Sequence, residues 1–435
     1  MKTQNITDAQ ASLQLFSGYT ESDEAIFAQF VNPNAKAEPG FLVDFLGSRI
    51  RTTTLWKEAR TFDGQLLGLP IPGDFHAETV EWIGLLKAVR SAGAEYVAME
   101  LGAGFGPWSI AGGAAARLRG ITNIRLCAVE ADSQHFQFLL QHFVDNGFDP
   151  ARHMLLEAAV GTQAGVAHWP TTGNSPAAET WGSRPIWQSQ DQPSQASPST
   201  KTIKIIPAND LVLREPCWDL VHIDVQGDEV DICRSCIDEL SARVRRIVAG
   251  THSRKIDGDL LDLMWRAGWL LEHEKPAKFD FSPGAAGLET MTRIDGTQVW
   301  RNPRLIHNGD PLKSFSQEIT SAIHEFRVKR GENYDFDITV RNTGLESWCG
   351  GGQAMTVAAS YRWFNSEGVN VPVEGQRTQL NCSVVKPGES DTLKLRVVGL
   401  PSSGLYSIWV SMVQEGVDWF VDKGAKPLVL RVHVE

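Results

Sequence analysis

The sequence of 435 residues has few cysteines, no long apolar run and no excess of positive charge. Six cysteines in a chain of this length do not make a disulfide framework, so we expect a reducing, cytoplasmic setting. No stretch of about 18 apolar residues is present, which excludes a membrane-spanning helix, and the N-terminus MKTQNITDAQASLQLF lacks the apolar centre of a secretory signal. The net charge of −11 argues against nucleic acid or an anionic membrane as the main partner.

One pair of cysteines has the spacing of a metal or redox motif. Cys233 and Cys236 form a CxxC within ICRSCIDEL, a pattern that predicts a helix. No second pair of cysteines or histidines follows at the spacing of a zinc site. We therefore interpret the two cysteines as packed side chains one helical turn apart.

The hydrophobic pattern divides the chain into an extension and two domains. Residues 1–75 are irregular and punctuated by Gly and Pro, and are treated as an N-terminal extension. Over residues 76–302, apolar strands alternate with helices, which predicts an α/β domain with a mostly parallel, Rossmann-like sheet covered on both faces. Residues 303–317 are the expected linker. Short alternating runs with turn signals over residues 318–435 predict an all-β sandwich.

A long insertion interrupts the α/β pattern at residues 170–200, which are rich in Pro, Ser, Gln and Thr. Loops of this length are binding loops, lids or disordered segments. Trp181 and Trp187 lie within it. Two interpretations stay open: a mobile loop with partly buried tryptophans, or a lid that presents aromatic faces to a substrate.

Three glycines follow the first apolar strand, in the sequence ELGAGFG. Glu100 ends the strand, and Gly102, Gly104 and Gly106 occupy every second position after it. Glycines at a strand end mark unusual dihedral angles or a close approach to the backbone. The NAD fingerprint G-x-G-x-x-G fits the first two glycines but meets Pro107 at its sixth position, and the GK[ST] of a P-loop is absent.

The spacing ELGAGFG resembles the first motif of class I S-adenosylmethionine (SAM) methyltransferases. The glycine turn then lets the backbone approach the methionine portion of SAM, and Glu100 balances its cationic groups, whereas it would repel a pyrophosphate. Glu130 ends the next strand, where an acid accepts hydrogen bonds from ribose hydroxyls in dinucleotide-binding folds. A plain turn between a strand and a helix is the rival interpretation for the glycines alone.

A second motif, LVHIDVQGDE, places Asp224 at the end of another buried strand. Ligands of open parallel sheets bind beyond the carboxyl ends of the strands. His252 follows the next strand, so we expect it to meet Asp224 there. Histidine titrates near neutral pH, which makes His252 the candidate general base, with Asp224 orienting it or binding the acceptor. The alternative is that His252 caps the next helix or packs in the cleft.

Residues 76–275 together resemble the FkbM-type family of SAM-dependent methyltransferases. The pieces that carry the resemblance are ELGAGFGPW, AVEAD, EAAVG, HIDVQGDE and THS. The resemblance implies a Rossmann-like fold, SAM as donor, and transfer to an oxygen, commonly of a sugar or natural product. It implies roles for three groups of residues: Glu100, Gly102, Gly104, Gly106 and Glu130 at the cofactor, Ala158 and Ala159 by the adenine, and Asp224, Glu229 and His252 in or near the reaction cleft. Glu229, Trp181 and Trp187 are the candidate substrate contacts.

The chain departs from the family pattern in two places. Gly250 stands where an acid often precedes the THS piece, which weakens the expectation of a charge network around His252. The C-terminal segment is similar to immunoglobulin-like sandwiches attached to bacterial glycan-modifying enzymes, which implies a saccharide acceptor and allows a homo-oligomer through the sandwich. A divalent metal stays open, because Asp224 and Glu229 alone are not a recognisable site.

The sequence thus predicts an O-methyltransferase that acts on a hydroxyl, that of a sugar in a surface glycan or glycosylated metabolite. A non-catalytic glycan-binding or scaffold protein is the alternative from another class. An NAD-dependent oxidoreductase is a further alternative, against which Pro107 and the lack of a recognisable nicotinamide site count.

Overall fold

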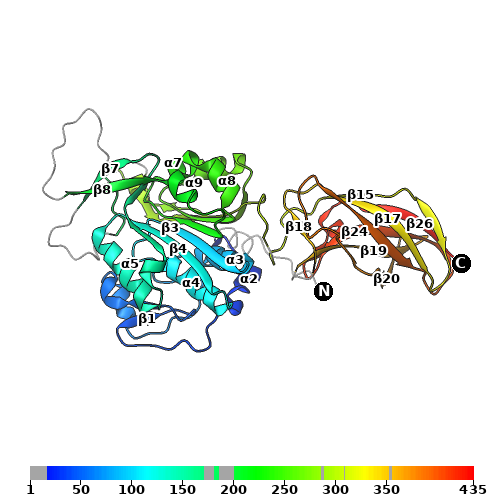
Figure 1. The fold of residues 1–435 in the computed structure, drawn as a ribbon, viewed down its shortest axis with the longest axis horizontal. Coiled ribbons are helices and arrows are strands. Elements are labelled where there is room, and N and C mark those ends of the chain that lie inside the picture. Colours follow the sequence, from blue (N-terminus) through cyan, green and yellow to red (C-terminus); the bar gives the residue numbers. More distant parts are fainter. Residues whose placement is uncertain (1–16, 171–180, 186–199, 286–288, 308, 352–354) are drawn as a thin grey trace. The chain divides into compact units, whose positions relative to one another are not determined.

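The structure is a computed structural model that describes residues 17–170, 181–185, 200–285, 289–307, 309–351 and 355–435 (Figure 1). The chain forms two compact units, and the boundary lies between Asn302 and Pro303. The segment predicted as a linker belongs to the second unit, where Leu312 is part of the core. Among the described residues, no helix is long and apolar enough to cross a membrane.

A seven-stranded sheet forms the centre of the first unit, in the order β11-β14-β10-β9-β3-β4-β5. Five neighbouring strands from β10 to β5 run parallel, whereas β14 is antiparallel to both β10 and β11. This confirms the predicted mostly parallel, Rossmann-like sheet. The strands are β3 (Glu95–Leu101), β4 (Asn123–Glu130), β5 (Met154–Glu157), β9 (Leu220–Ile223), β10 (Arg246–Thr251), β11 (Leu270–Lys275) and β14 (Gly296–Arg301).

Helices cover both faces of this sheet (Figure 1). One face carries α3 (Thr79–Ser91), α4 (Pro107–Leu118) and α5 (Ser133–Asp145), and the other carries α7 (Glu229–Ser235), α8 (Ile237–Arg243) and α9 (Arg254–Arg266). The short helices α2 (Glu21–Glu24) and α6 (Ala208–Val212) complete the set of α-helices in the described part. Because each face has its own apolar core, strands buried on both sides read as continuous apolar runs.

The helix predicted around the CxxC is two helices, which meet at Cys236. The backbone of Cys236 leaves the helical region, with φ −135° and ψ 24°. Cys233 and Cys236 are both buried and unbonded. Burial raises the pKa of the Cys236 thiol to about 12. The pair therefore acts as packing, as interpreted from the sequence.

The described part of the N-terminal extension packs as part of the first unit. It contains a two-stranded antiparallel pair, β1 (Phe41–Val43) and β2 (Arg49–Arg51), and the 3-10 turns η1 (Phe27–Gln29), η2 (Thr52–Thr54) and η3 (Ala59–Phe62). Arg51 donates two hydrogen bonds to the carboxylate of Asp145 at the end of α5, at 2.7 and 3.0 Å. Phe45 packs edge-on against Trp82 of α3, with ring centroids 5.3 Å apart.

A small three-stranded sheet holds the two ends of the long insertion. The segment HMLLEAAVG, one largely apolar run, forms two strands, β5 and β6 (Ala159–Gly161), with Ala158 between them. Strand β6 joins β8 (Thr200–Pro207) and β7 (Gly165–Pro170) in a separate sheet of order β6-β8-β7, which the sequence analysis missed. The short elements η4 (Pro150–Arg152), β12 (Lys278–Phe279), η6 (Glu289–Met291) and β13 (Thr292–Ile294) complete this unit.

The second unit is a β-sandwich. One sheet has the order β15-β17-β23 and the other β16-β26-β24-β19-β20. Ile338 and Leu395 of the first sheet share one apolar core with Trp363 and Val410 of the second, which confirms the all-β domain. The immunoglobulin-like subtype stays a prediction. The strands are β15 (Gln317–Thr320), β16 (Glu325–Val328), β17 (Asn333–Asn342), β19 (Val357–Asn365), β20 (Asn370–Glu374), β23 (Ser390–Val398), β24 (Gly404–Gln414) and β26 (Leu428–Val434). Shorter pieces are β18 (Trp348–Cys349), β21 (Thr378–Gln379), β22 (Val384–Val385), β25 (Asp418–Trp419) and η7 (Val421–Lys423).

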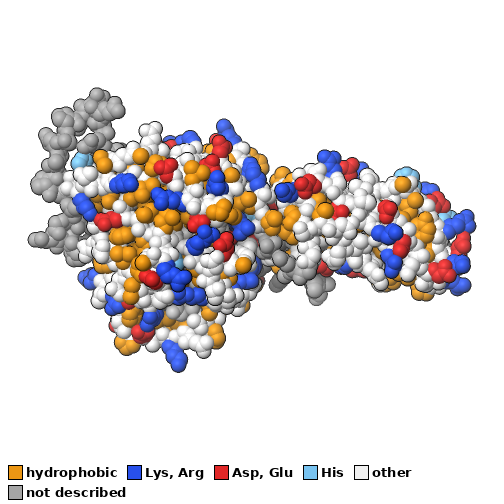
Figure 2. Space-filling view, viewed as in Figure 1, with side chains coloured by type: hydrophobic (Ala, Val, Ile, Leu, Met, Phe, Trp, Pro, Cys, Tyr) orange, Lys and Arg blue, Asp and Glu red, His pale blue; other side chains and the backbone are white. Residues whose placement is uncertain are grey.

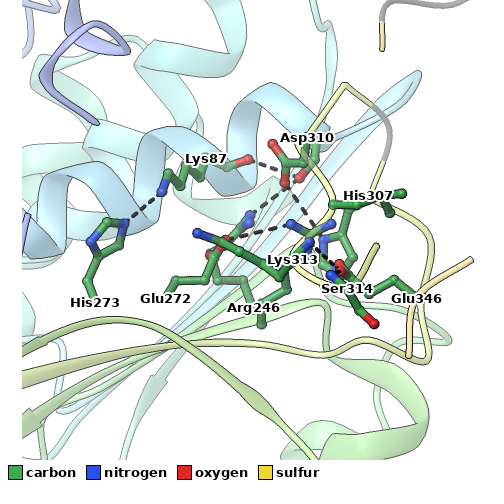
Figure 3. Close-up of polar contacts among 12 residues, drawn as sticks. Lys87, Arg246, Glu272, His273, His307, Asp310, Lys313, Ser314 and Glu346 are labelled. Atoms are coloured by element: carbon green, nitrogen blue, oxygen red, sulfur yellow. Dashed lines mark hydrogen bonds and ion pairs between the residues drawn. The ribbon is translucent and has the colours of Figure 1, made fainter. Parts of the chain in front are cut away.

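Charged side chains are used differently on the surface and inside. Figure 2 shows acidic and basic groups interspersed over the visible face of each unit. Inside the first unit, Arg246 of β10 and Glu272 of β11 form an ion pair at 2.7 Å, and Lys87 contacts His273 at 2.7 Å (Figure 3). All four side chains are nine-tenths or more buried. In the second unit, Glu346 accepts hydrogen bonds from the backbone N–H groups of residues 313 and 314 (Figure 3).

Candidate functional site

The described residues of the first unit enclose a cavity of about 550 Å³ at the carboxyl ends of the parallel strands. Strands β3 and β9 are neighbours in the sheet, although β4 and β5 lie between them in the sequence. Such a switch in strand order opens the crevice in which ligands of α/β sheets bind. Nine of the residues predicted for the site line this cavity: Glu100, Gly102, Gly104, Glu130, Ala158, Ala159, Trp181, Asp224 and His252.

The glycine turn needs its glycines for different reasons. Gly102, Gly104 and Gly106 all have left-handed backbone angles, with φ of 76°, 55° and 76°. A Cβ atom on Gly102 would lie 1.8 Å from the carbonyl oxygen of Asp224, so this glycine lets β3 and β9 end side by side. Gly104 faces the cavity beside the ring of Trp181. Gly106 precedes α4, packs near Leu139, and is not among the described cavity residues.

Glu100 is a buried acid at the start of α4. Its carboxylate accepts hydrogen bonds from the backbone N–H groups of Trp108 (3.2 Å) and Ser109 (2.8 Å), and from the Ser109 hydroxyl (2.6 Å). A carboxylate at a helix N-terminus is favoured by the helix dipole. Burial raises the pKa of Glu100, against the opposing effects of His222 and these hydrogen bonds. Its predicted contact with the cofactor stays a prediction.

Glu130 fixes the other side of the glycine turn. One carboxylate oxygen accepts a hydrogen bond from the Gly104 N–H at 2.7 Å, and the other accepts one from the Asp132 N–H at 2.6 Å. Burial raises the pKa of Glu130 to about 8. Each oxygen retains acceptor capacity toward the cavity. The predicted hydrogen bonds to ribose hydroxyls stay a prediction.

His252 lies between two carboxylates. Its Nδ1 is 2.9 Å from Glu229 Oε1, and its Nε2 is 3.2 Å from Asp224 Oδ1. Burial alone would lower the pKa of His252, but the hydrogen bonds and charges of Asp224 and Glu229 raise it to about 10. The expected meeting of His252 and Asp224 is therefore observed, and near neutral pH the ring is an imidazolium that donates to both acids.

This geometry bears on two roles predicted from the sequence. Both ring nitrogens of His252 face carboxylates, an arrangement that disfavours a general base, so that role stays a prediction. Glu229 is 0% exposed and also accepts hydrogen bonds from Gly227 N and Val225 N, which disfavours its predicted contact with the substrate. Asp224 is the member that faces the cavity, with 41% of its side chain exposed.

The same three residues bear on the open question of a metal. Asp224, Glu229 and His252 offer donor atoms that all lie within 4.8 Å of one another, a set that could hold a cation. In the structure these atoms bond to one another. A proton on His252 and a cation would therefore compete for the same oxygens.

Aromatic rings form one wall of the cavity. Trp181 stacks on His135 with ring centroids 3.8 Å apart, and lies edge-on to Trp56 and Phe105, each at 5.8 Å. Trp56 and Phe75 come from the segment before α3, which the sequence analysis had set aside as an extension. Nothing in their spacing marks them as site residues, because only the tertiary fold brings them to the sheet edge.

Two further tryptophans belong to the predicted insertion or its border. Trp169, at the end of β7, also lines the cavity. The indole N–H groups of Trp169 and Trp181 are buried and have no hydrogen-bond partner among the described residues. Trp187, predicted as a substrate contact, lies outside the described residues.

The cavity is strongly acidic. Among the described residues that line it, Arg293 is the one arginine or lysine, against eight carboxylates. These are Asp74, Glu78, Glu81, Glu100, Glu130, Asp224, Asp228 and Asp295. Several come from the segment before α3 or from the loop before β14, and sequence reasoning did not find them. A field of this sign attracts a cationic ligand and repels an anionic one.

Comparison with known proteins bears on the family of the chain. No family model matches the chain. A protein of Jannaschia sp. (strain CCS1) named "Putative methyltransferase" is 33% identical over 282 residues, which are 64% of this chain and 98% of that relative. Two solved structures are similar to this chain. One is a precorrin-6y C5,15-methyltransferase from Geobacter metallireducens GS-15, with 14% identity over 52% of this chain and 89% of that one and a TM-score of 0.28. The other is methyltransferase FkbM from Methylobacillus flagellatus KT, with 15% identity over 48% of this chain and 44% of that one and a TM-score of 0.27. Because the Jannaschia relative is matched over almost its entire length, the chain belongs to the same methyltransferase family.

Proposed function

We propose that this methyltransferase uses SAM and transfers the methyl group to a hydroxyl oxygen, that of a sugar in a glycan or glycosylated metabolite. The acidic cavity at the glycine turn carries the proposal. SAM has a sulfonium and an ammonium, which the excess of acidic over basic side chains in the described lining attracts. The same field repels the pyrophosphate of NAD, so the oxidoreductase alternative is disfavoured.

The described residues fit the parts of SAM. Gly102 and Gly104 line the cavity without a side chain at the end of β3, and the Glu100 carboxyl lies beside them. Glu130 has the acceptor oxygens for ribose hydroxyls. The small buried side chains of Ala158 and Ala159 offer a flat apolar surface to the adenine. When bound, SAM would supply an electrophilic methyl group on its sulfonium.

Asp224 is the group we assign to the acceptor. Its exposed carboxylate can accept the hydrogen of a hydroxyl and hold the oxygen in line for attack, which is where positioning contributes most. With the methyl group supplied by SAM, which would leave as S-adenosylhomocysteine when its S–CH₃ bond breaks, Asp224 would take the hydroxyl proton and pass it to water. His252 is a positioning residue that orients Asp224 with a charged hydrogen bond, and buried Glu229 holds His252 in place.

The aromatic wall favours a sugar over a small polar acceptor. The rings of Trp56, Phe75 and Trp181 give the cavity broad apolar faces of the kind on which the C–H faces of a sugar ring pack. The indole N–H of Trp181 has no hydrogen-bond partner among the described residues, so it could donate to a sugar hydroxyl. The notion that the second unit binds glycan, or joins two copies of the chain, belongs to the same proposal and rests on its sequence resemblance alone.

Titration calorimetry with S-adenosylhomocysteine and with NAD tests the cofactor class. We expect micromolar binding of the first and none of the second. Transfer to sugar acceptors is then screened by mass spectrometry, and NMR of the product decides between O-, N- and C-methylation. We expect Asp224→Asn to lower kcat by about 100-fold or more while S-adenosylhomocysteine still binds.

Each alternative predicts a different pattern in these assays. Binding of neither ligand favours the non-catalytic glycan-binding protein, and the test then moves to binding of glycans by the full chain. Binding of NAD alone would refute the proposal. Binding of S-adenosylhomocysteine together with undiminished transfer by Asp224→Asn would keep the methyltransferase but overturn the role of Asp224.

A further inference from the structure

His222 is a buried histidine that the proposed reaction does not use. It lies on β9, two residues before Asp224, and lines the cavity although only 3% of the residue is exposed. Neither ring nitrogen has a hydrogen-bond partner among the described residues. A buried polar group without a partner costs free energy, so an orphaned histidine that borders a cavity points to a ligand.

The ring of His222 is held in one orientation. It stacks on Trp108 at the start of α4, with ring centroids 5.0 Å apart and an interplanar angle of 27°. The Trp108 ring is itself packed, since it lies edge-on to Trp82 with ring centroids 5.1 Å apart. His222 is therefore a rigid donor at the floor of the cavity.

Two carboxylates flank this donor. Glu100 is the register partner of His222 on the neighbouring strand β3, and its charge interacts with His222. Glu81 of α3 has an oxygen 3.8 Å from His222 Nε2, beyond hydrogen-bond reach. Thr297 donates to the other oxygen of Glu81 at 3.0 Å, which fixes that side chain as well.

A nitrogen donor between two acids complements a zwitterion. An α-carboxylate can accept a hydrogen bond from His222, and the adjacent α-ammonium can lie against Glu81 or Glu100. SAM carries this head group at the end opposite its adenosine. Building on the proposed function, we propose that His222 binds the carboxylate of the amino-acid end of the methyl donor and so selects for cofactors that carry it.

Two ligands that differ only at this end test the inference. S-Adenosylhomocysteine has the amino-acid group, whereas 5′-methylthioadenosine has a methyl group in its place. Calorimetry on the full chain compares both ligands with the wild type, with His222→Phe, which keeps the stacked ring but loses the nitrogens, and with His222→Gln, which restores a donor. His153→Phe is the matched control, since its ring packs against Phe143 and Phe148 away from the described cavity residues.

The inference predicts a selective loss. We expect His222→Phe to weaken the binding of S-adenosylhomocysteine by about 10- to 100-fold, the range for a hydrogen bond to a charged group. The binding of 5′-methylthioadenosine is expected to weaken by less than about twofold. His222→Gln is expected to recover part of the loss, and His153→Phe to change neither affinity. Thermal melting of each variant shows that it is folded.

Other outcomes overturn the inference in distinguishable ways. Equal weakening of both ligands by His222→Phe would mean that the ring only shapes the site. Unchanged binding of both would mean that His222 is a packing residue. If the wild type binds neither ligand, the proposed function fails and this inference fails with it. If the wild type binds both equally, the methyl-donor site stands and only the assignment of the amino-acid end is lost.

Discussion

Replacing Glu229 with glutamine is expected to lower the pKa of His252 sharply. The pKa of His252 is about 10, against 6.5 for an unperturbed histidine. That difference means that His252 binds its proton about 5 kcal/mol more favourably in the folded protein than an unperturbed histidine does in water. Two carboxylates share this effect, and a contacting opposite charge moves a pKa by about 1–3, so the pKa is expected to fall to about 8 in Glu229→Gln.

NMR measurement of the His252 ring signals against pH gives this pKa directly. The matched control is Asp295→Asn, because Asp295 interacts electrostatically with His252 but makes no hydrogen bond to it. We expect the control to change the pKa by less than half as much. A wild-type His252 that titrates near 6.5, or a Glu229→Gln variant with an unchanged pKa, would refute the reasoning and restore His252 as a candidate base.

The same pKa makes a prediction about stability. Because the folded pKa of His252 lies above the unfolded value, its contribution to stability is fully present below about pH 6.5 and is lost as the pH rises through about 10. Urea unfolding between pH 7 and 10 should therefore show a smaller loss of stability in His252→Gln than in the wild type. An equal pH dependence in both proteins would contradict the imidazolium.

Three further outcomes are expected. Gly102→Ala should abolish binding of S-adenosylhomocysteine and lower the melting temperature strongly, because its Cβ would clash with the carbonyl oxygen of Asp224. The control Gly120→Ala has a similar φ and open space around it, so it should lower the free energy of unfolding by only about 1–2 kcal/mol in a urea titration. Glu272→Gln should destabilise the protein by about 3–5 kcal/mol, because it removes the negative charge that lies 2.7 Å from buried Arg246. Loss of the exposed ion pair in Asp262→Asn should cost less than about 1 kcal/mol by the same measurement. If Asp224, His252 and Glu229 work through their own hydrogen bonds, EDTA should leave methyl transfer unchanged, and restoration of lost activity by added Mg²⁺ would contradict this.

The sequence predicted those parts of the fold that depend on local pattern. These parts are the apolar strands, the helices on both faces and the change to period-two alternation after residue 310. In each of them, the apolar pattern of a single segment indicates which of its side chains are buried. The strands β7 and β8 were not predicted, because they pair with each other, and β8 also pairs with β6, in a separate small sheet. The long insertion separates β7 from β8 in the sequence, so no hairpin pattern marks the pair. The split at Cys236 depends on a backbone angle that no residue type dictates there.

The candidate site divides in the same way. Gly102, Glu130 and Asp224 were found because strand ends in a parallel sheet converge, which spacing along the chain reveals. The sequence predicted that His252 meets Asp224 but not the second carboxylate on its ring, which comes from Glu229 at the start of α7. His222 and the acids before α3 were missed because only tertiary packing turns them toward the cavity.

The excess of carboxylates around the cavity has a consequence for turnover. A sulfonium donor brings a positive charge into this negative field, but the thioether that remains after transfer has lost that charge. The enzyme would then bind the sulfonium donor more tightly than the thioether product by electrostatics alone, without any change of shape. Inhibition by the thioether product would be correspondingly weak. Because exposed charges are screened by salt, this discrimination should narrow as ionic strength rises.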